Sequence, residues 1–219
     1  MSFPLPFMIF AIAIASAMAA FCAPAMGRED ERELVWAEQL ARTPRHAFFV
    51  QLASYQGQHA AMAIRVVDRE TAVLVQEITK IDGLDLPLSP SRFVRLVDAN
   101  ADGHPDIQLS ADAGGAGPNN TAFFYLFDPQ AGQYRFHAGL SELTQIAVAP
   151  DGTIESASRG SCCHHAAQTH RFINGELTLI KSWEEALTPD GKWLEVTSGV
   201  LKNGKMRYKS RRRRPPVNY

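Results

Sequence analysis

The sequence has few of the features by which membrane-spanning and catalytic chains are recognised. Its long apolar run, Phe7 to Phe21, is shorter than the roughly 20 residues that a transmembrane helix needs. It has no G-x-S-x-G motif, no Gly-Lys-Ser/Thr phosphate loop and no pair of acids that stands out as a glycosidase dyad. Its hydrophobic content is ordinary for a globular protein. These features predict a globular protein that is not an enzyme.

Cysteine is also scarce, with three in 219 residues, and two of them are adjacent at Cys162 and Cys163. His164 and His165 follow, so thiol and imidazole ligands for zinc or copper occur together. Adjacent residues of an extended chain point apart, however, whereas structural zinc sites use spaced pairs such as C-x2-C. The alternatives are a vicinal disulfide, which we expect first, two reduced thiols, a pairing with Cys22, or a metal site.

The N-terminal apolar run is typical of a secretory signal peptide, which we predict at residues 1–25. Ala17-Met18-Ala19 fits the A-x-A cleavage rule, and Ala23-Pro24-Ala25 fits it less closely. Cys22 raises the alternative of a lipoprotein anchor, although the bulky Phe21 stands where lipoprotein processing expects a small residue. An uncleaved membrane anchor is a further alternative. We expect export to the periplasm with no stable membrane span, in a compartment that permits disulfides and supplies calcium.

Charge is unevenly distributed, although the whole chain has a formal net charge of −1. From Lys202 to the C-terminus there are eight Lys or Arg residues and no acid, which leaves 14 basic against 23 acidic residues before them. Residues 202–219 are therefore predicted to form a basic tail, either solvated or in contact with an anionic surface. Aromatic residues are not interleaved with these charges, so nucleic acid is not expected as a partner.

Most of the remaining chain has the pattern of short antiparallel strands joined by tight turns. Asp151-Gly152, Asn174-Gly175 and Asn203-Gly204 are dipeptides typical of type I′ hairpin turns. The strands that we expect are Ala47–Tyr55, His59–Val67, Thr71–Thr79, Thr121–Phe127, Gln133–His137, Gln145–Ala149, Thr153–Ser158, Gln168–Ile173, Glu176–Lys181, Trp193–Leu201 and Lys205–Lys209. This spacing predicts an all-β fold of antiparallel hairpins, arranged as a sandwich, a barrel or an irregular propeller.

The segment before these strands has a different pattern. Between Arg28 and Arg42 several apolar residues cluster on one helical face, and Thr43-Pro44 would end a helix there. We therefore predict a short N-terminal helix within a lead-in segment at residues 26–44. The β domain is predicted at residues 45–201.

The stretch from Val97 to Asp106 places oxygen-bearing side chains at alternate positions. It matches the first nine positions of the EF-hand loop, D-x-[DN]-x-[DN]-G-x-x-[DE], in which Gly103 permits a sharp turn. The twelfth position is Leu109 instead of the bidentate Glu, and both flanks alternate as strands do. We therefore predict a structural Ca2+ in a β-loop-β unit, with an ordinary acidic turn as the alternative. The predicted ligands are Asp98, Asn100, Asp102, Asp106 and the carbonyl oxygen of His104.

A glycine-rich loop at residues 113–120 follows soon after the calcium loop. It is not a phosphate loop, because no Gly-Lys-Ser/Thr follows and the next element is a strand. Because it begins so soon after the calcium loop, one hypothesis is that the two share a surface and that Asp112 adds a ligand; the alternative is an ordinary flexible loop. Asn119-Asn120-Thr121 within it matches an N-glycosylation sequon, a match that is common by chance.

Several motifs follow one another between roughly residues 45 and 182, and the calcium loop is the most specific of them. They are Val75–Glu77, Val97–Ile107, Phe123–Asp128, Ser156–Gly160 and Phe172–Leu177. Their order resembles that of the calcium-binding periplasmic immunity proteins associated with a bacteria-killing type IV secretion system. Members of that family neutralise a lysozyme-like, peptidoglycan-hydrolysing effector, and their fold resembles that of periplasmic lysozyme inhibitors.

The resemblance implies an exported protein that binds and inhibits a macromolecular partner, a cell-wall hydrolase. It implies calcium at the ligands named above. Lysozyme inhibitors of this kind often present a Ser-Gly-x-Tyr loop, whereas Ser198-Gly199-Val200-Leu201 has no Tyr. The alternative is an envelope or glycan-binding module with structural calcium and no inhibitory role.

Overall fold

The computed structural model describes residues 33–55, 58–85, 90–111, 119–161 and 163–215. The predicted signal peptide, Cys162 and most of the glycine-rich loop lie outside these residues, so the predictions made for them are not tested. Within the described ranges, no helix combines the length and the apolar character that crossing a membrane requires.

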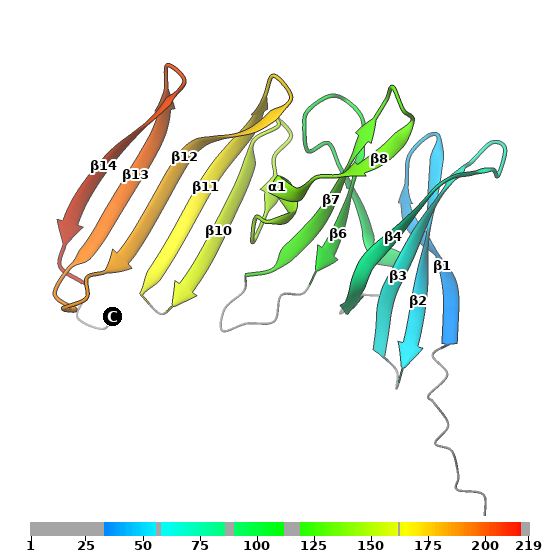
Figure 1. Ribbon diagram of the computed structural model, residues 1–219, viewed down its shortest axis with the longest axis horizontal. Coiled ribbons are helices and arrows are strands. Elements are labelled where there is room, and N and C mark those ends of the chain that lie inside the picture. The colour runs from blue at the N-terminus through cyan, green and yellow to red at the C-terminus, as the bar shows by residue number, and fades with distance from the viewer. Residues whose placement is uncertain (1–32, 56–57, 86–89, 112–118, 162, 216–219) are drawn as a thin grey trace, which may run out of the picture. The chain divides into compact units, whose positions relative to one another are not determined.

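The all-β prediction is confirmed, because the described residues form fourteen strands and two short helical segments (Figure 1). In chain order the elements are β1 (Glu33–Arg42), β2 (His46–Tyr55), β3 (Gln58–Asp68), β4 (Leu74–Asp85), η1 (Pro90–Arg92), β5 (Val94–Val97), β6 (Asp106–Ala111), β7 (Thr121–Asp128), β8 (Gln133–Phe136), α1 (Ala138–Ser141), β9 (Ala147–Val148), β10 (Ile154–Ser161), β11 (His164–Ile173), β12 (Glu176–Leu187), β13 (Leu194–Lys202) and β14 (Lys205–Arg213). They form three antiparallel sheets: sheet A in the order β1-β2-β3-β4, sheet B in the order β5-β6-β7-β8, and sheet C in the order β14-β13-β12-β11-β10-β9.

The main hydrophobic core lies between sheets A and B, which together form a β-sandwich. Val50 of β2 and Ile64 of β3 are fully buried on the sheet A side, and Ile107 and Leu109 of β6 are fully buried on the sheet B side. Buried residues recur at every second position, because successive side chains of a strand point to opposite faces. This arrangement fixes β6, and with it the loop that precedes β6.

Two glutamine side chains from sheet A bind the edge strands of sheet B. Gln76 of β4 donates from Nε2 to the carbonyl oxygen of Tyr134 at 2.8 Å, and its Oε1 accepts from the Tyr134 backbone N–H at 2.8 Å. Gln39 of β1, which is 1% exposed, accepts at Oε1 from the backbone N–H of Val94 at 3.0 Å. An edge strand otherwise leaves backbone groups unpaired. The two amides therefore join the sheets at β5 and at β8.

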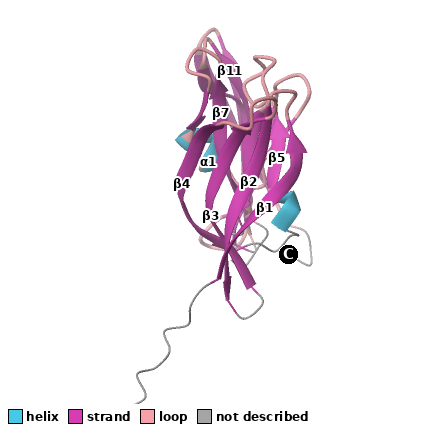
Figure 2. Cartoon of the chain, turned by 90° about the vertical axis from the view of Figure 1, so that its right-hand side faces the viewer, coloured by secondary structure: helices cyan, strands magenta, loops and turns pink. Residues whose placement is uncertain are grey.

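A second, smaller core connects sheet B to sheet C through α1. Leu140 of α1, Phe124 of β7 and Ile154 of β10 are fully buried in it. Figure 2 shows α1 beside the strands, in contact with β7. Asn119 adds a third amide bridge, because its Oδ1 accepts from the Arg159 backbone N–H and its Nδ2 donates to the Arg159 carbonyl, both at 2.9 Å.

The helix predicted between Arg28 and Arg42 is wrong, because Glu33–Arg42 forms β1, paired antiparallel with β2. The exposure of the side chains has the alternation of a strand, since Gln39 is 1% exposed, whereas Leu34 and Leu40 on the opposite face are 57% and 60% exposed. Pairing with β2 satisfies the backbone, and the inward side chains join the main core, which outweighs the helical clustering of apolar residues. The described part of the predicted lead-in, from Glu33 onward, therefore belongs to the β domain.

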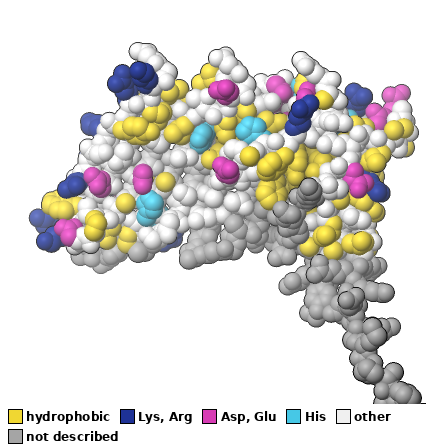
Figure 3. Space-filling view, viewed as in Figure 1, with side chains coloured by type: hydrophobic (Ala, Val, Ile, Leu, Met, Phe, Trp, Pro, Cys, Tyr) yellow, Lys and Arg dark blue, Asp and Glu magenta, His cyan; other side chains and the backbone are white. Residues whose placement is uncertain are grey.

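The separate basic tail is also wrong, because Lys205–Arg213 forms β14 and pairs with β13 without a shift in register. The strand expected at Lys205–Lys209 is longer than predicted and extends the sheet beyond residue 201. Figure 3 shows Lys and Arg side chains gathered at this end of sheet C. The basic residues are thus held on a regular strand instead of a solvated terminus.

Two of the three predicted type I′ turns are confirmed by positive φ at both central residues. The angles are 54° and 82° at Asn174 and Gly175, and 50° and 72° at Asn203 and Gly204. At Asp151-Gly152 only the glycine has a positive φ, 75°. The type I′ prediction is wrong there, because Pro150 fixes a negative φ and the loop has three residues, Pro150 to Gly152.

Candidate metal centre

The predicted calcium loop connects β5 to β6, which pair antiparallel with Val97 opposite Asp106. The flanks are strands, so the prediction of a β-loop-β unit is confirmed. The backbone turns through two residues with positive φ, Ala101 at 57° and Gly103 at 84°. Glycine adopts this conformation without steric cost. The turn brings the loop side chains back toward their own backbone N–H groups.

Three of the predicted ligands lie on the solvent side of the loop and are tied to it by hydrogen bonds. Asp98 accepts at Oδ1 from the Asp102 N–H (3.1 Å) and at Oδ2 from the Gly103 N–H (3.0 Å). Asn100 accepts at Oδ1 from the Asp102 N–H (3.2 Å) and donates from Nδ2 to the Asp102 Oδ2 (2.7 Å). Asp102 accepts at Oδ1 from the His104 N–H (2.8 Å). The loop is therefore held in a curled form by its own side chains.

The fourth side-chain ligand, Asp106, is fully buried at the start of β6. Its Oδ2 accepts from the Ala99 N–H at 2.9 Å, and its Oδ1 accepts from the Phe127 N–H at 2.8 Å. The carboxyl thus connects the loop to β7 of the same sheet. Burial is the largest of the effects that together raise the pKa of Asp106 to about 6; the two N–H donors lower it, and the negative charges of Asp102 and Asp98 raise it.

The charge of the loop favours a cation. Asp98 and Asp102 act electrostatically on Asp106, and in the part of the chain that the structure describes no Lys, Arg or His forms an ion pair with any of the three. The donors are carboxylate, amide and carbonyl oxygens, the set that Ca2+ takes. Within the same residues, however, no three His, Cys, Asp or Glu side chains lie close enough to form a metal group. The loop thus has the donor chemistry for calcium but not a closed cage.

Two contacts of the loop were not predicted from the sequence. Ala99, between two predicted ligands, is fully buried in the second core, and the ring of His104 packs against Phe127 with centroids 5.5 Å apart. The His104 carbonyl was predicted as a ligand; its N–H is bonded to Asp102. An apolar residue between two acidic or amide residues of a loop is a sequence signal that the loop is anchored in a core at that position. The contact with Phe127 has no comparable local signal, because Phe127 is distant in the sequence.

The turn between β9 and β10 lies directly against the calcium loop. A Cβ atom built on Gly152 would be 2.6 Å from the Cβ of Ala101, well inside van der Waals contact. Both residues have positive φ. Only glycine at position 152 therefore lets the turn approach the loop this closely.

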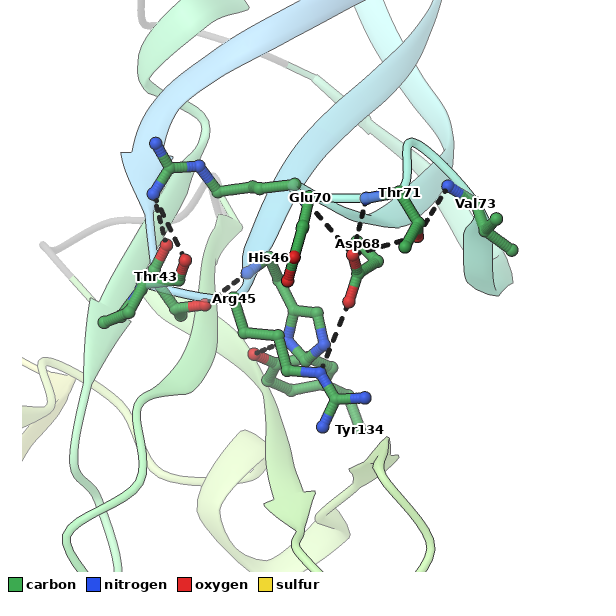
Figure 4. Close-up of polar contacts among 10 residues, drawn as sticks. Thr43, Arg45, His46, Asp68, Glu70, Thr71, Val73 and Tyr134 are labelled. Atoms are coloured by element: carbon green, nitrogen blue, oxygen red, sulfur yellow. Dashed lines mark hydrogen bonds and ion pairs between the residues drawn. The ribbon is translucent and has the colours of Figure 1, made fainter.

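A cluster of polar contacts surrounds His46 (Figure 4), whose ring centroid lies 5.8 Å from that of Phe127. His46 is 3% exposed, and its Nδ1 is 3.5 Å from the Tyr134 hydroxyl. Burial and then the charge of Arg45 lower the pKa of His46, so the ring is neutral near pH 7. Nearby, Asp68 accepts from the Thr71 N–H at 3.0 Å, and such hydrogen bonds lower the pKa of Asp68. This cluster has the character of core packing and turn formation.

Among the described residues of the run Cys162 to His165, the side chains do not form a group that could hold a metal ion. His164 and His165 are consecutive residues of β11, so their side chains point to opposite faces. His164 Nε2 lies 2.9 Å from Glu184 Oε1 of the neighbouring strand β12, and this cross-strand pair is on an exposed face of sheet C. The vicinal disulfide remains a prediction, because Cys162 lies outside the described residues. The Ser198–Leu201 segment lies inside β13, where it forms no loop.

Comparison with known proteins yields a likeness in fold. The structure is similar to a solved structure described as that of a Xanthomonas type IV secretion system related protein, with a TM-score of 0.58 and 18% sequence identity. The match covers 83% of this chain and 95% of that chain. The two chains share a fold. No family model matches the sequence, and no curated protein matches it.

Proposed function

We propose that this chain is an exported protein whose β-sandwich is braced by one Ca2+ at residues 98–106, and that it binds and inhibits a lysozyme-like peptidoglycan hydrolase. Calcium would be structural, and it would not take part in any reaction. Its role would be to hold the loop, together with the β9–β10 turn, in one conformation before the partner docks. A surface that is ordered in advance loses less entropy on binding.

The buried Asp106 is the observation that carries the calcium proposal. A carboxylate has about four lone-pair sites, and its two N–H donors use only two of them, so oxygen lone pairs remain for a cation. The same holds for Asp98, whose oxygens each accept one N–H. A divalent ion would relieve the mutual repulsion of the three acids, which no basic side chain relieves in the described residues.

The fold and the order of the sequence motifs support the inhibitory role. Neither of them identifies the enzyme that is inhibited, so the inhibitory role is the further step of this proposal. A protein related to a type IV secretion system shares the fold, and the sequence resembles immunity proteins of such a system. A Ser-Gly-x-Tyr loop is not available for docking, because Ser198–Leu201 is in the middle of a strand. We therefore assign docking to the surface formed by the calcium loop and the Gly152 turn.

Inhibition should depend on calcium. Purified protein in 5 mM Ca2+ should slow the clearing of a peptidoglycan suspension by a lysozyme-like hydrolase at least tenfold at equimolar ratio. Asp98→Ala should lose most of this inhibition, whereas Glu184→Ala, an exposed acid of β12, should keep it. Equal inhibition in EDTA and in Ca2+ would show that inhibition does not require calcium. Binding to purified peptidoglycan without any effect on the hydrolase would favour the envelope-binding alternative.

Calcium stabilisation should increase with pH. The folded-state pKa of Asp106, about 6, is above the ordinary value of 3.8, so the stability due to its protonated form is present below pH 3.8 and lost as pH rises through about 6. Calcium binds the ionised carboxylate and competes with this proton. At a calcium concentration ten times Kd, the melting temperature should rise by about 3–6 °C at pH 7.5 and by less than half of that at pH 5.

The measurement is the difference between melting temperatures in Ca2+ and in EDTA at each pH. The buried histidines His46 and His170 and the half-buried His137, whose pKa values burial lowers, act in both conditions and cancel in the difference. A calcium shift that is the same at pH 5 and pH 7.5 would exclude Asp106 as a ligand. The absence of any shift would exclude the site.

A further inference from the structure

The edge of sheet C formed by β14 differs from both edges of sheet B and from the opposite edge of sheet C. β5 and β8, the edges of sheet B, are bound by the side chains of Gln39 and Gln76. β9, the opposite edge of sheet C, has only two residues. β14 has nine residues, pairs with β13 without a bulge and is exposed along almost its whole length. It therefore presents a straight row of backbone N–H and C=O groups.

The side chains of β14 divide into two different faces. Lys205, Arg207, Lys209 and Arg211 occupy alternate positions and so share one face, and among the described residues none of them forms an ion pair. On the other face, Tyr208 is 62% exposed, and its ring lies against Gly199, where a Cβ would meet Tyr208 Cε1 at 2.8 Å. The edge is thus cationic on one face, whereas the other face carries Met206, Tyr208, Ser210 and Arg212.

The charges select what can pair with this edge. A second copy of the chain pairing β14 against β14 would place Lys and Arg opposite Lys and Arg, which is destabilising. An acidic partner strand would instead complete the pattern that the sheet already uses, because Arg212 lies 3.7 Å from Glu195 of β13 and Arg213 contacts Glu185 of β12. An interface that repels partners of like charge and attracts partners of opposite charge is a common way to specify one partner.

We propose that β14 is a docking edge for an extended acidic segment of another protein, which adds to sheet C as a further strand. The fitting segment alternates acidic residues, which face Lys205, Arg207, Lys209 and Arg211, with apolar residues, which lie beside Met206 and Tyr208. Main-chain hydrogen bonds supply affinity and the alternate side chains supply specificity. The proposal does not rest on calcium or on the hydrolase.

The probe is a fluorescein-labelled nine-residue peptide that alternates Glu and Val, titrated with the full chain at low salt and followed by anisotropy. Arg207→Glu with Lys209→Glu should weaken binding at least tenfold. The control pair Arg92→Glu with Arg95→Glu, exposed residues of η1 and β5 that give the same change in charge outside sheet C, should stay within twofold of the unmodified protein. A peptide alternating Lys and Val should bind the double β14 variant more tightly than the unmodified protein, and a cooperative thermal unfolding transition shows that the variant is folded.

A second peptide separates strand addition from simple charge attraction. The same Glu-Val sequence with N-methyl groups on the backbone edge that would face β14 keeps its charge but cannot pair, and it should bind at least tenfold more weakly. Equal binding of the N-methylated peptide would overturn the proposal, as would the absence of peptide binding at 1 mM. Binding to phosphatidylglycerol vesicles, but not to the peptide, would assign the edge to anionic lipid and also overturn it.

Discussion

Asp106→Ala is expected to lower the free energy of unfolding by about 2–4 kcal/mol and to abolish the response of the protein to calcium. The substitution leaves the Ala99 and Phe127 N–H groups buried without their acceptor, and each such group costs about 1–3 kcal/mol. Chemical denaturation in EDTA at pH 5 measures this cost, because Asp106 is largely protonated there and the loss of a buried charge contributes little. The melting temperature should fall by about 6–12 °C.

Asp98→Ala is the matched comparison, because it removes a proposed ligand that is exposed. Its N–H donors, on Asp102 and Gly103, are in reach of water, so the unfolding free energy in EDTA should change by less than about 1 kcal/mol. In calcium both variants should lose the calcium-induced rise in melting temperature. If Asp106→Ala were as stable as Asp98→Ala in EDTA, the carboxyl would not be the connection between the loop and β7.

Gly152→Ala is expected to destabilise the chain by about 2–4 kcal/mol and to weaken calcium binding severalfold. Alanine at position 152 has to adopt a φ of 75°, which is unfavourable for a residue with a Cβ and costs about 1–2 kcal/mol. It also meets the Cβ of Ala101 at 2.6 Å, and such overpacking costs about 1–3 kcal/mol. Because Ala101 is in the calcium loop, relief of this contact must move the proposed ligands. Urea denaturation and calcium titration measure the two effects.

Gly175→Ala isolates the contact from the backbone strain. Gly175 has a φ of 82°, and nothing lies within 4 Å of the position of its Cβ, so only the backbone cost of about 1–2 kcal/mol should appear, with no change in calcium affinity. Adding Ala101→Gly to Gly152→Ala should recover about 1–3 kcal/mol beyond the effect of Ala101→Gly alone. A coupling near zero in this double-mutant cycle would mean that the turn does not press on the loop.

Local patterns predicted the parts of this fold that local physics determines. Asn-Gly at positions 174 and 203 specified tight turns because both central residues need positive φ, and runs rich in aromatic and other apolar residues specified strands such as β2 and β7. The β-loop-β character of the calcium loop followed from the strand pattern of its flanks. The curled loop, with its side chains bonded to its own N–H groups, is also a local structure.

The features that the sequence did not reveal depend on contacts between distant residues. β1 was predicted as a helix because its apolar residues fit a helical face, and only pairing with β2 decides for a strand. The last strand was expected to end at Lys209, with the arginines after it in a solvated tail, but pairing with β13 holds Arg211 to Arg213 in the sheet. The second anchor of Asp106, on Phe127, joins residues 21 positions apart, which no motif records.

The amide bridges restrict which residues can occupy a few positions. At Gln76 the side chain donates to a carbonyl and accepts from the N–H of the same residue, Tyr134. Glutamate has the same length, but its ionised form offers two acceptors, and one of them would face the carbonyl oxygen. Spontaneous hydrolysis of the amide would therefore release β8 from sheet A, so slow deamidation is a route by which the stored protein ages. The bridge at Asn119 carries the same liability, and a glycan on its nitrogen would occupy one of the two hydrogens and crowd the contact with Arg159.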